Sequence, residues 1–584
     1  MTKNVALVSL LLSAAGLVVS LFAPSQAPQN EFGVRHRPSG DELVIHYKFI
    51  ADHWTSFSDQ LEQLYPPDDT TTLGVFAQTC FAFQRGRFTL AIQKAQHVCT
   101  EAPALVHFLL GYSYLRIGNY PRAEEELEKA VLHHRLVLED ATKALAEVYE
   151  FGEQPQAIAA LMAQSELAVH LPINYQKRHY LQHLKLGRYA VVVYHGISRS
   201  INRFGLMASV LITLAWLFYL RELDIFERES WAFTAVVCVA GMFFSLGTFL
   251  LSDVNNLILE KSLTGEYVND LMYSIIGIGI IEELVKIIPV ALVIAFSKEI
   301  DEPYDMIFYA CVSALGFAFV ENLVYFDGDH TEIIHSRAFT SVVGHMIFTS
   351  IVAYGFLLQR YRHPDWNVWI VFGAFFFMAS VVHGVYDFLL IKKWMIPFFF
   401  YFILIIQVWL ILINNAINNS KYFTYQFQIE ADRIQSYLVL ALTGILVVEY
   451  VAMAWQHGQA EAHRGLWQAV LGGSFPILFL ATKLSRFDIV KNYWRQLTFS
   501  LMSIQNFVMN NVKPLNFVGH HVHLLMQGQD KPGVITERRI LIHRDGYADT
   551  YWFEVELEEP LLVKNQPISR ALISFQRPII ELIG

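Results

Sequence analysis

Apolar segments long enough to cross a lipid bilayer constrain the fold of this chain more than any other feature. A membrane-spanning helix needs about 20 predominantly apolar residues, and about nine such segments follow one another between residues 205 and 482. With 54% hydrophobic and 16% charged residues and a mean hydropathy of +0.35, the chain is too apolar for a wholly soluble protein. We therefore predict a mainly α, polytopic transmembrane helix bundle embedded in a lipid bilayer. The predicted spans are Gly205 to Leu220, Trp231 to Leu251, Leu271 to Phe296, Tyr304 to Phe326, Ala338 to Leu358, Asn367 to Leu390, Met395 to Ile413, Ser436 to Trp455 and Leu466 to Thr482.

The chain opens with an uncharged stretch, Asn4 to Ala23, after a single lysine. We expect residues 1–23 to be a signal anchor or a signal peptide, and the weakly basic start favours an anchor that is not cleaved. An anchor added to nine later spans places Met1 and the C-terminal region on the same side of the membrane. Basic residues after the last span predict that this side is cytoplasmic. They are Lys483, Arg486, Lys491 and Arg495.

A second basic group precedes the first span of the bundle and does not fit this topology. It would be extracytoplasmic, although long translocated domains largely escape the charge rule. Its members are Lys177, Arg178, Lys185, Arg188, Arg199 and Arg203. The net charge of −10 and a pI near 6.1 give no overall basic excess, so we expect no nucleic-acid partner.

Residues 24–204 have the composition of a soluble helical domain, and they contain a weak repeat. The pattern is a glycine, an aromatic residue two positions later and a small alanine three further on, and it recurs at spacings typical of tetratricopeptide helix pairs. In such a pair the glycine ends the first helix and the alanine lets the second helix pack closely. We predict a tetratricopeptide-like surface for a protein partner or substrate; a helical hairpin domain without a ligand is the alternative. The repeated residues are Gly86, Phe88 and Ala91, then Gly118, Tyr120 and Ala123, then Gly152 and Ala157.

Residues 483–584 change character again. The segments Arg538 to His543 and Tyr551 to Leu557 are rich in β-branched and aromatic residues, and an Asp545-Gly546 pair lies between them. Asp-Gly is a strong signal for a hairpin turn. We predict a small, soluble, β-rich C-terminal domain.

Three charged residues interrupt the apolar stretch Leu271 to Phe296: Glu282, Glu283 and Lys286. A single charge at the centre of a spanning helix costs roughly 2.5 to 3.5 kcal/mol on insertion scales. Glu282 and Lys286 lie about 40° apart on a helix, and Glu283 lies about 60° from Lys286 on its other flank. The lysine can therefore bridge both carboxylates.

Later spans carry further ionisable residues at membrane depth. Glu321 and Tyr325 share a helix face, with Asn322 beside them, and His383 precedes Asp387 by one turn. His345 follows Arg337 and Thr340 in the span between them. Such a set can activate water in two ways. Glutamates and histidines can hold a divalent metal such as zinc, or a glutamate can act directly as general base.

These residues, in this order on successive spans, resemble the PrsW family of intramembrane proteases, which is related to CAAX prenyl endopeptidases and bacteriocin-immunity membrane proteins. The motifs are Glu-Glu-x-x-Lys, Gly-Phe-x-x-x-Glu-Asn-x-x-Tyr, Arg-x-x-Thr-x-x-x-x-His and His-x-x-x-Asp, within residues 262–390. The resemblance implies peptide-bond hydrolysis in or near a bacterial inner membrane, on a membrane-anchored protein substrate. It carries over to Glu282, Glu283, Lys286, Glu321, His345 and His383, with Asp305 as an acidic residue upstream. Ala310 replaces a usual glycine, and Asp387 stands where asparagine is frequent.

We accordingly predict an endopeptidase that uses a water nucleophile. Glu282 or Glu283 would be the base and Lys286 its charge partner, while Asp387 would orient the site. Metal ligands would come from Glu283, Glu321, His345 and His383. Supporting roles are predicted for Asn322, Tyr325, Arg337, Thr340 and Asp305.

Two other functional classes remain open on sequence alone. Buried acids also relay protons or bind cations in transporters, although no inverted repeat is visible among the spans. A non-catalytic membrane scaffold that presents the helical-repeat domain is the other. In every case we expect the helical-repeat domain to be extracytoplasmic and the C-terminal domain to be cytoplasmic.

Overall fold

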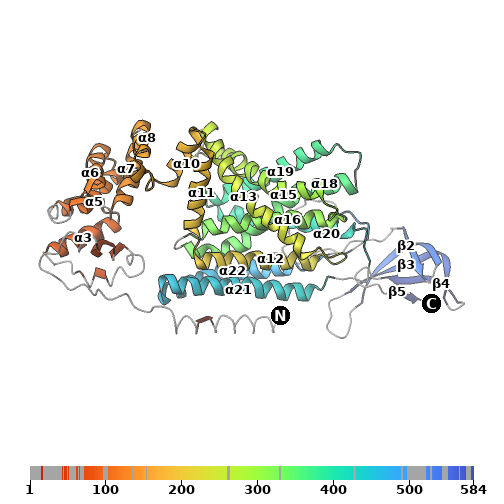
Figure 1. Cartoon of the computed structure of the whole chain (residues 1–584). Helices are drawn as coiled ribbons and strands as arrows, with labels where there is room; N and C mark the ends of the chain where they lie inside the picture. Colours follow the sequence, from red (N-terminus) through yellow and green to blue (C-terminus); the bar gives the residue numbers. More distant parts are fainter. Residues whose placement is uncertain are drawn as a thin grey trace.

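A computed structural model shows three parts in chain order: a helical domain, a helix bundle and a β-sheet (Figure 1). It describes residues 71–96, 103–133, 137–152, 154–259, 263–327, 330–424, 429–487 and 491–495, most of 521–583 as strands, and scattered positions before residue 71. The mainly α class with a small C-terminal sheet is confirmed. The predicted anchor, residues 1–23, lies outside the described residues except for Ala15 and Gly16.

The helical domain is built from consecutive antiparallel helix pairs. The first two turns share one backbone geometry: Gly86 and Gly118 adopt positive φ angles of 69° and 78°. Their hydrogen bonds also match, since Arg87 N donates to Ala82 O and Asn119 N donates to Tyr114 O. This is the glycine helix stop that the sequence pattern predicts. The helices are α3 (Thr72–Gln84), α4 (Phe88–Ala95), α5 (Pro103–Arg116), α6 (Tyr120–His133), α7 (Leu138–Phe151), α8 (Pro155–Ala163) and the short α9 (Ser165–Ala168).

A further pair, α10 (Ile173–Gln182) and α11 (Leu186–Ser200), follows the same pattern without its glycine. Leu184 takes the left-handed position with φ 52°, and Lys185 N donates to Tyr180 O as in the earlier turns. A leucine is rarely found at positive φ. The residue that corresponds to Ala91 and Ala123 is Tyr189, and its hydroxyl donates to Asp253 of the bundle at 2.7 Å. This pair therefore joins the helical domain to the bundle. The tetratricopeptide assignment itself stays a prediction.

In the part of the chain that the structure describes, nine long helical segments form the bundle, and their bounds extend most of the predicted spans by a few residues. Among the described residues, seven helices are long and apolar enough to cross a membrane. The two other predicted spans are the segment around α15, in which a π-helix joins α14 to α15, and α22. The segments are α12 (Arg203–Leu223), α13 (Trp231–Leu259), α14 (Tyr267–Met272) with η1 (Tyr273–Gly279) and α15 (Ile280–Phe296), α16 (Pro303–Tyr325), α17 (Ile334–Ser336) with η3 (Arg337–Ser341) and α18 (Val342–Tyr361), α19 (Val368–Ile391), α20 (Met395–Asn418), α21 (Ala431–His457) and α22 (Gln459–Lys483).

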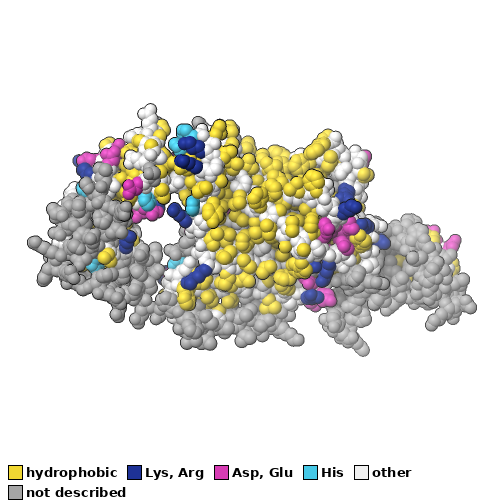
Figure 2. Space-filling view, in the orientation of Figure 1, with side chains coloured by type: hydrophobic (Ala, Val, Ile, Leu, Met, Phe, Trp, Pro, Cys, Tyr) yellow, Lys and Arg dark blue, Asp and Glu magenta, His cyan; other side chains and the backbone are white. Residues whose placement is uncertain are grey.

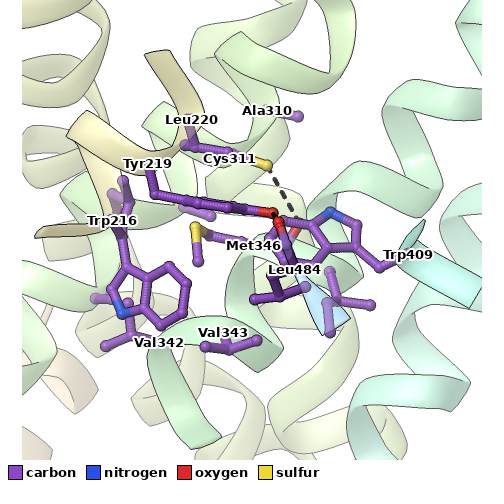
Figure 3. Close-up of a cluster of buried hydrophobic side chains, with 14 of the residues drawn as sticks. Trp216, Tyr219, Leu220, Ala310, Cys311, Val342, Val343, Met346, Trp409 and Leu484 are labelled. Atoms are coloured by element: carbon purple, nitrogen blue, oxygen red, sulfur yellow. Dashed lines mark hydrogen bonds between the residues drawn. The ribbon is translucent and has the colours of Figure 1, made fainter. Parts of the chain in front are cut away.

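Helix α16 lies at the centre of the bundle and is buried along most of its length. It crosses α13 at two glycines, because a Cβ on Gly316 would lie 2.1 Å from the Cys238 carbonyl oxygen and one on Gly241 would lie 2.3 Å from that of Ser313. Small residues allow such close helix contact in membranes. Large aromatic side chains fill the neighbouring core, where Trp216, Tyr219 and Trp409 converge (Figure 3).

The helices alternate in direction, so the bundle has two ends. At one end Ser200 donates to Asp327 and Lys177 pairs with Asp253 at 2.9 Å. At the opposite end Tyr219 donates to the Leu484 carbonyl, and Ser420 donates to Glu302. We call these the α11 end and the α22 exit end. Apolar side chains cover the visible side of the bundle between them (Figure 2).

The C-terminal sheet is a five-stranded antiparallel meander in the order β1-β2-β3-β4-β5. The two strands predicted from composition pair with each other, with Arg538 opposite Phe553. Asp545 and Gly546 lie outside the described residues. The strands are β1 (His521–Met526), β2 (Gln529–Leu541), β3 (Thr550–Val563), β4 (Gln566–Ile573) and β5 (Ile580–Ile583).

Candidate active site

Most of the polar residues predicted from four spans meet in one cluster inside the bundle, between α15, α16, α18 and α19. Two of these helices begin with π-helical turns, Tyr273–Gly279 before α15 and Arg337–Ser341 before α18. Such turns are rare and occur frequently at functional sites. Gly279 allows the first of them to touch α19, since a Cβ there would lie 2.4 Å from the Ser380 carbonyl oxygen. The glycine and the π-turns thus set how α15 presents its charges.

Lys286 lies at the centre of the cluster and is completely buried. Its Nζ is 3.0 Å from Glu282 Oε2 and 3.0 Å from Glu283 Oε1. It is also 2.8 Å from His345 Nδ1, and it lies 4.2 Å from the centre of the Phe317 ring. The ammonium therefore compensates two carboxylates at once, as the helix spacing predicts.

The two adjacent glutamates have different surroundings. Glu283 is fully buried, and its oxygens accept hydrogen bonds from Lys286, from Thr349 at 2.9 Å and from His383 Nδ1 at 2.9 Å. The Glu282 side chain is 13% exposed and contacts Lys286. Both carboxylate oxygens of Glu283 thus have hydrogen-bond partners, whereas the Glu282 side chain is partly exposed at the edge of the cluster.

Each histidine places one ring nitrogen on a carboxylate. His383 Nδ1 lies 2.9 Å from Glu283 Oε1, and His345 Nε2 lies 2.7 Å from Glu321 Oε2. A carboxylate that accepts from one ring nitrogen fixes the tautomer and leaves the other nitrogen as a lone-pair donor. His383 is further held by stacking on Phe348, with ring centres 4.5 Å apart. The second nitrogens contact other groups: His345 Nδ1 lies 2.8 Å from Lys286 Nζ, and His383 Nε2 lies 3.3 Å from Asp387 Oδ2.

Those second nitrogens converge on Glu282. Its Oε2 lies 3.7 Å from His383 Nε2 and 3.9 Å from His345 Nδ1, and one ligand atom of each residue lies within 4.8 Å of the others. Ligands of a tetrahedral zinc ion, each about 2.0 to 2.1 Å from the metal, are roughly 3.3 Å apart. Two histidines and one glutamate also form a known catalytic zinc ligand set. The donor types therefore fit a divalent metal, and the donor atoms would have to move closer together to hold one.

This donor set differs from the predicted one, which has Glu283 and Glu321 as ligands and not Glu282. Both of those carboxylates contact a histidine ring nitrogen, and which glutamate would be a ligand stays a prediction. Lys286 Nζ contacts the same Glu282 oxygen and His345 nitrogen. The ammonium and a metal ion would therefore compete for these two atoms.

Glu321 is positioned by a clamp of three predicted supporting residues. Arg337 donates to Glu321 at 2.7 Å through Nη2 and to Asn322 at 2.6 Å through Nε. The guanidinium lies 4.0 Å from the centre of the Tyr325 ring. The clamp fixes the carboxylate that orients His345.

Three other predicted residues fall in different places. Asp387 lies in the cluster, with Oδ2 3.3 Å from His383 Nε2. Thr340 donates to the Ser336 carbonyl within its own turn and stays outside the cluster. Asp305 lies 16 residues before Glu321 on the same helix, which is about 24 Å along the axis. It caps the start of α16 at the α22 exit end, so the expectation that it supports this site is wrong.

Sequence reasoning missed two groups of contacts. Thr349 lies one turn after His345, a spacing that could have revealed it. Glu449 of α21 is buried and accepts from the backbone N of His335 at 2.7 Å and contacts its Nδ1 at 2.8 Å. This pair holds the chain two residues before Arg337, and no spacing in the sequence links it to the site.

One edge of the cluster is open. The side chains of Glu282, Glu321 and Asp387 are 13%, 20% and 21% exposed, whereas those of Glu283 and Lys286 are not exposed. Glu321 lies four residues before the end of α16. The opening is therefore closer to the α11 end of the bundle.

Comparisons with known proteins agree with this geometry. Residues 229–413 match the family described as "PrsW family intramembrane metalloprotease". A "Protease PrsW" of Geobacillus kaustophilus is 28% identical over 184 residues, which are 31% of this chain and 76% of the relative. One from Clostridioides difficile is 25% identical over 226 residues, 37% of this chain and 92% of the relative. One from Oceanobacillus iheyensis is 27% identical over 187 residues, 32% of this chain and 82% of the relative.

No solved structure matches the chain. The matched segment begins in the loop before α13 and ends within α20, so it contains every helix of the cluster. The predicted resemblance and the membrane-protease class are confirmed. The helical pairs, α21, α22 and the sheet lie outside the matched segment.

Proposed function

We propose, because residues 229–413 match the PrsW family of intramembrane metalloproteases, that this chain hydrolyses a peptide bond of a membrane-anchored protein. The nucleophile would be a water activated beside Glu282, His345 and His383. One observation carries the proposal: two histidines are each held by a carboxylate, and their other nitrogens converge on the partly exposed Glu282. If the two buried histidines were purely structural, they would not need a third carboxylate, Glu282, next to their other nitrogens at the exposed edge of the cluster.

Glu282, His345 and His383 would hold a divalent metal such as zinc. When bound, the metal would lower the pKa of a water molecule and polarise the scissile carbonyl. The donor types and their separations support this assignment, and so does the description of the matched family as metalloproteases.

The remaining residues would orient the two histidine rings and neutralise the charges of the carboxylates. Lys286 compensates Glu282 and Glu283, which allows two carboxylates to stay ionised in a buried site. Glu283 and Glu321 keep His383 and His345 in the required tautomers. Asp387, partly exposed beside His383, can accept a proton at the open edge.

The open edge near the α11 end suggests where substrate arrives. The helical pairs lie at this end of the bundle (Figure 1), and they would select or exclude a substrate segment. In the predicted orientation, within a bacterial inner membrane, this end faces away from the cytoplasm, whereas the sheet lies on the cytoplasmic side.

New protein N-termini in membranes test the proposal, because they report cleavage of any membrane protein and not of one chosen substrate. We would compare cells that express the full chain, its Glu282→Gln variant and, as a matched control, Glu222→Gln, which lies in α12 at the α22 exit end. We expect cleavage sites in or next to transmembrane segments for the first and third proteins and none for Glu282→Gln. The same cleavage by Glu282→Gln would refute the proposal.

The transporter class makes a different prediction. If the cluster conducts ions, proteoliposomes with the full chain should show a cation or proton flux that Glu282→Gln removes. A scaffold would show neither flux nor cleavage. We expect cleavage without flux.

A further inference from the structure

Helix α11 lies across the end of the bundle instead of running along it (Figure 1). It is fixed there by Tyr189, which donates to Asp253 of α13, and by Ser200, which donates to Asp327 just after α16. Candidate spans of these helices end at Ile258 and Tyr325. Helix α11 is therefore at the level where the apolar spans end, which is where a membrane meets water.

The sequence of α11 gives it two different exposed flanks. The covered face contains Tyr189, Val193 and Ile197, spaced four residues apart. At about 100° per residue, Leu186, Ala190 and Tyr194 project on one side of it. Arg188, His195 and Arg199 project on the other, and all six are exposed.

The apolar flank is unusually exposed for a helix outside a membrane. Tyr194 is 68% exposed and Leu186 is 53% exposed. In the turn before the helix, Leu184 is 81% exposed. Contiguous exposed apolar groups of this kind mark a contact surface.

The basic flank indicates the chemistry of the partner. Arg188 and Arg199 form no ion pair with a described residue, and Lys185 is also exposed. An amphipathic helix with cationic residues beside an apolar face lies in the plane of a membrane interface and is attracted by anionic lipids.

We propose that α11 is an interfacial helix: Leu186 and Tyr194 enter the boundary of the acyl chains, and Arg188 and Arg199 bind anionic phospholipid headgroups. This accounts for two members of the basic group that disagrees with the predicted topology, because Arg188 and Arg199 would bind lipid instead of reporting a side of the membrane. The lipid contact also holds the helical pairs at the membrane surface, near the opening beside Glu321. The proposal does not depend on protease activity.

Spin labels on the full chain in lipid nanodiscs test the two flanks. Tyr194→Cys and His195→Cys differ by one position and by about 100° around the helix, and both side chains are exposed, so neither change removes a core contact. We expect the label at 194 to collide more with oxygen than with a water-soluble nickel chelate, and the label at 195 to show the reverse. Equal chelate access at both positions would overturn the proposal.

The headgroup contact is tested by lipid composition at the same label. Discs that contain phosphatidylglycerol should increase insertion at position 194 relative to phosphatidylcholine alone, by roughly fivefold for each arginine that contacts the surface. R188Q/R199Q should remove this increase. R360Q/R362Q, which removes two exposed arginines at the α22 exit end, should retain it. An unchanged lipid effect in R188Q/R199Q would overturn the anionic-lipid assignment.

Discussion

Replacing Glu283 with glutamine should lower the stability of the protein strongly and its activity only moderately. Oε1 of Glu283 contacts Lys286 Nζ at 3.0 Å and His383 Nδ1 at 2.9 Å, and Oε2 accepts from Thr349 at 2.9 Å. A glutamine can place its carbonyl where Oε1 is and its amide toward Thr349, whose hydroxyl can accept. The variant therefore keeps the shape of the contacts and loses only the charge.

The expected cost follows from those contacts. Two hydrogen bonds change from charge-assisted to neutral, which removes about 1 kcal/mol each, and Lys286 loses one of two anionic partners in a buried site. We expect Glu283→Gln to lower the free energy of unfolding by roughly 3 kcal/mol. Glu282→Gln removes a contact at a partly exposed edge, and we expect a loss of roughly 1 kcal/mol.

The effects on activity should be the reverse of those on stability: Glu282→Gln should lower kcat more than Glu283→Gln does. Glu283→Gln still accepts from His383 Nδ1 and so preserves the tautomer; we expect about tenfold lower kcat. Glu282→Gln should lower kcat by at least roughly a hundredfold, because it removes a ligand of the metal proposed to activate the water. The assays are unfolding in a denaturing detergent and cleavage of a substrate identified by its new N-terminus. Equal stability losses, or complete inactivation by Glu283→Gln alone, would refute the reasoning.

Three further predictions concern other parts of the bundle. Glu449→Gln should weaken its contacts to His335 and lower kcat several-fold with little change in KM, measured beside the wild type; an unchanged kcat would exclude a positioning role. Burial raises the pKa of Glu302 to about 8, so the folded state holds this proton more tightly than the unfolded one. The free energy of unfolding should therefore fall as pH rises from about 4.5 to 8, and Glu302→Gln should flatten a pH series of melting temperatures. Gly316→Ala should lower thermal stability strongly because its Cβ would overlap a carbonyl oxygen of α13, whereas Gly373→Ala meets no atom within 4 Å and should melt like the wild type.

Much of the site could be predicted because helix periodicity is local. The spacing of Glu282, Glu283 and Lys286 within one helix determines that the lysine reaches both carboxylates. The order of polar residues on successive spans likewise brings His345 and His383 near them, since all are buried charges or dipoles that need partners in the membrane.

The parts that could not be predicted depend on packing between helices. Which glutamate faces the opening is set by the π-helical turn before α15 and by its contact with α19 at Gly279. The distance between Asp305 and Glu321, by contrast, follows from helix rise within one predicted span and could have been predicted. The contact of Glu449 with His335 joins residues that are 114 positions apart, and no local pattern encodes it.

Metal content measured together with cleavage tests the central claim most directly. The full chain, purified in lipid nanodiscs, should hold about one divalent ion, lose it with its activity in a chelator, and regain both when zinc is restored. His383→Ala and Glu282→Gln should bind much less metal while they remain folded. Undiminished cleavage by protein from which all metal has been removed would contradict the account.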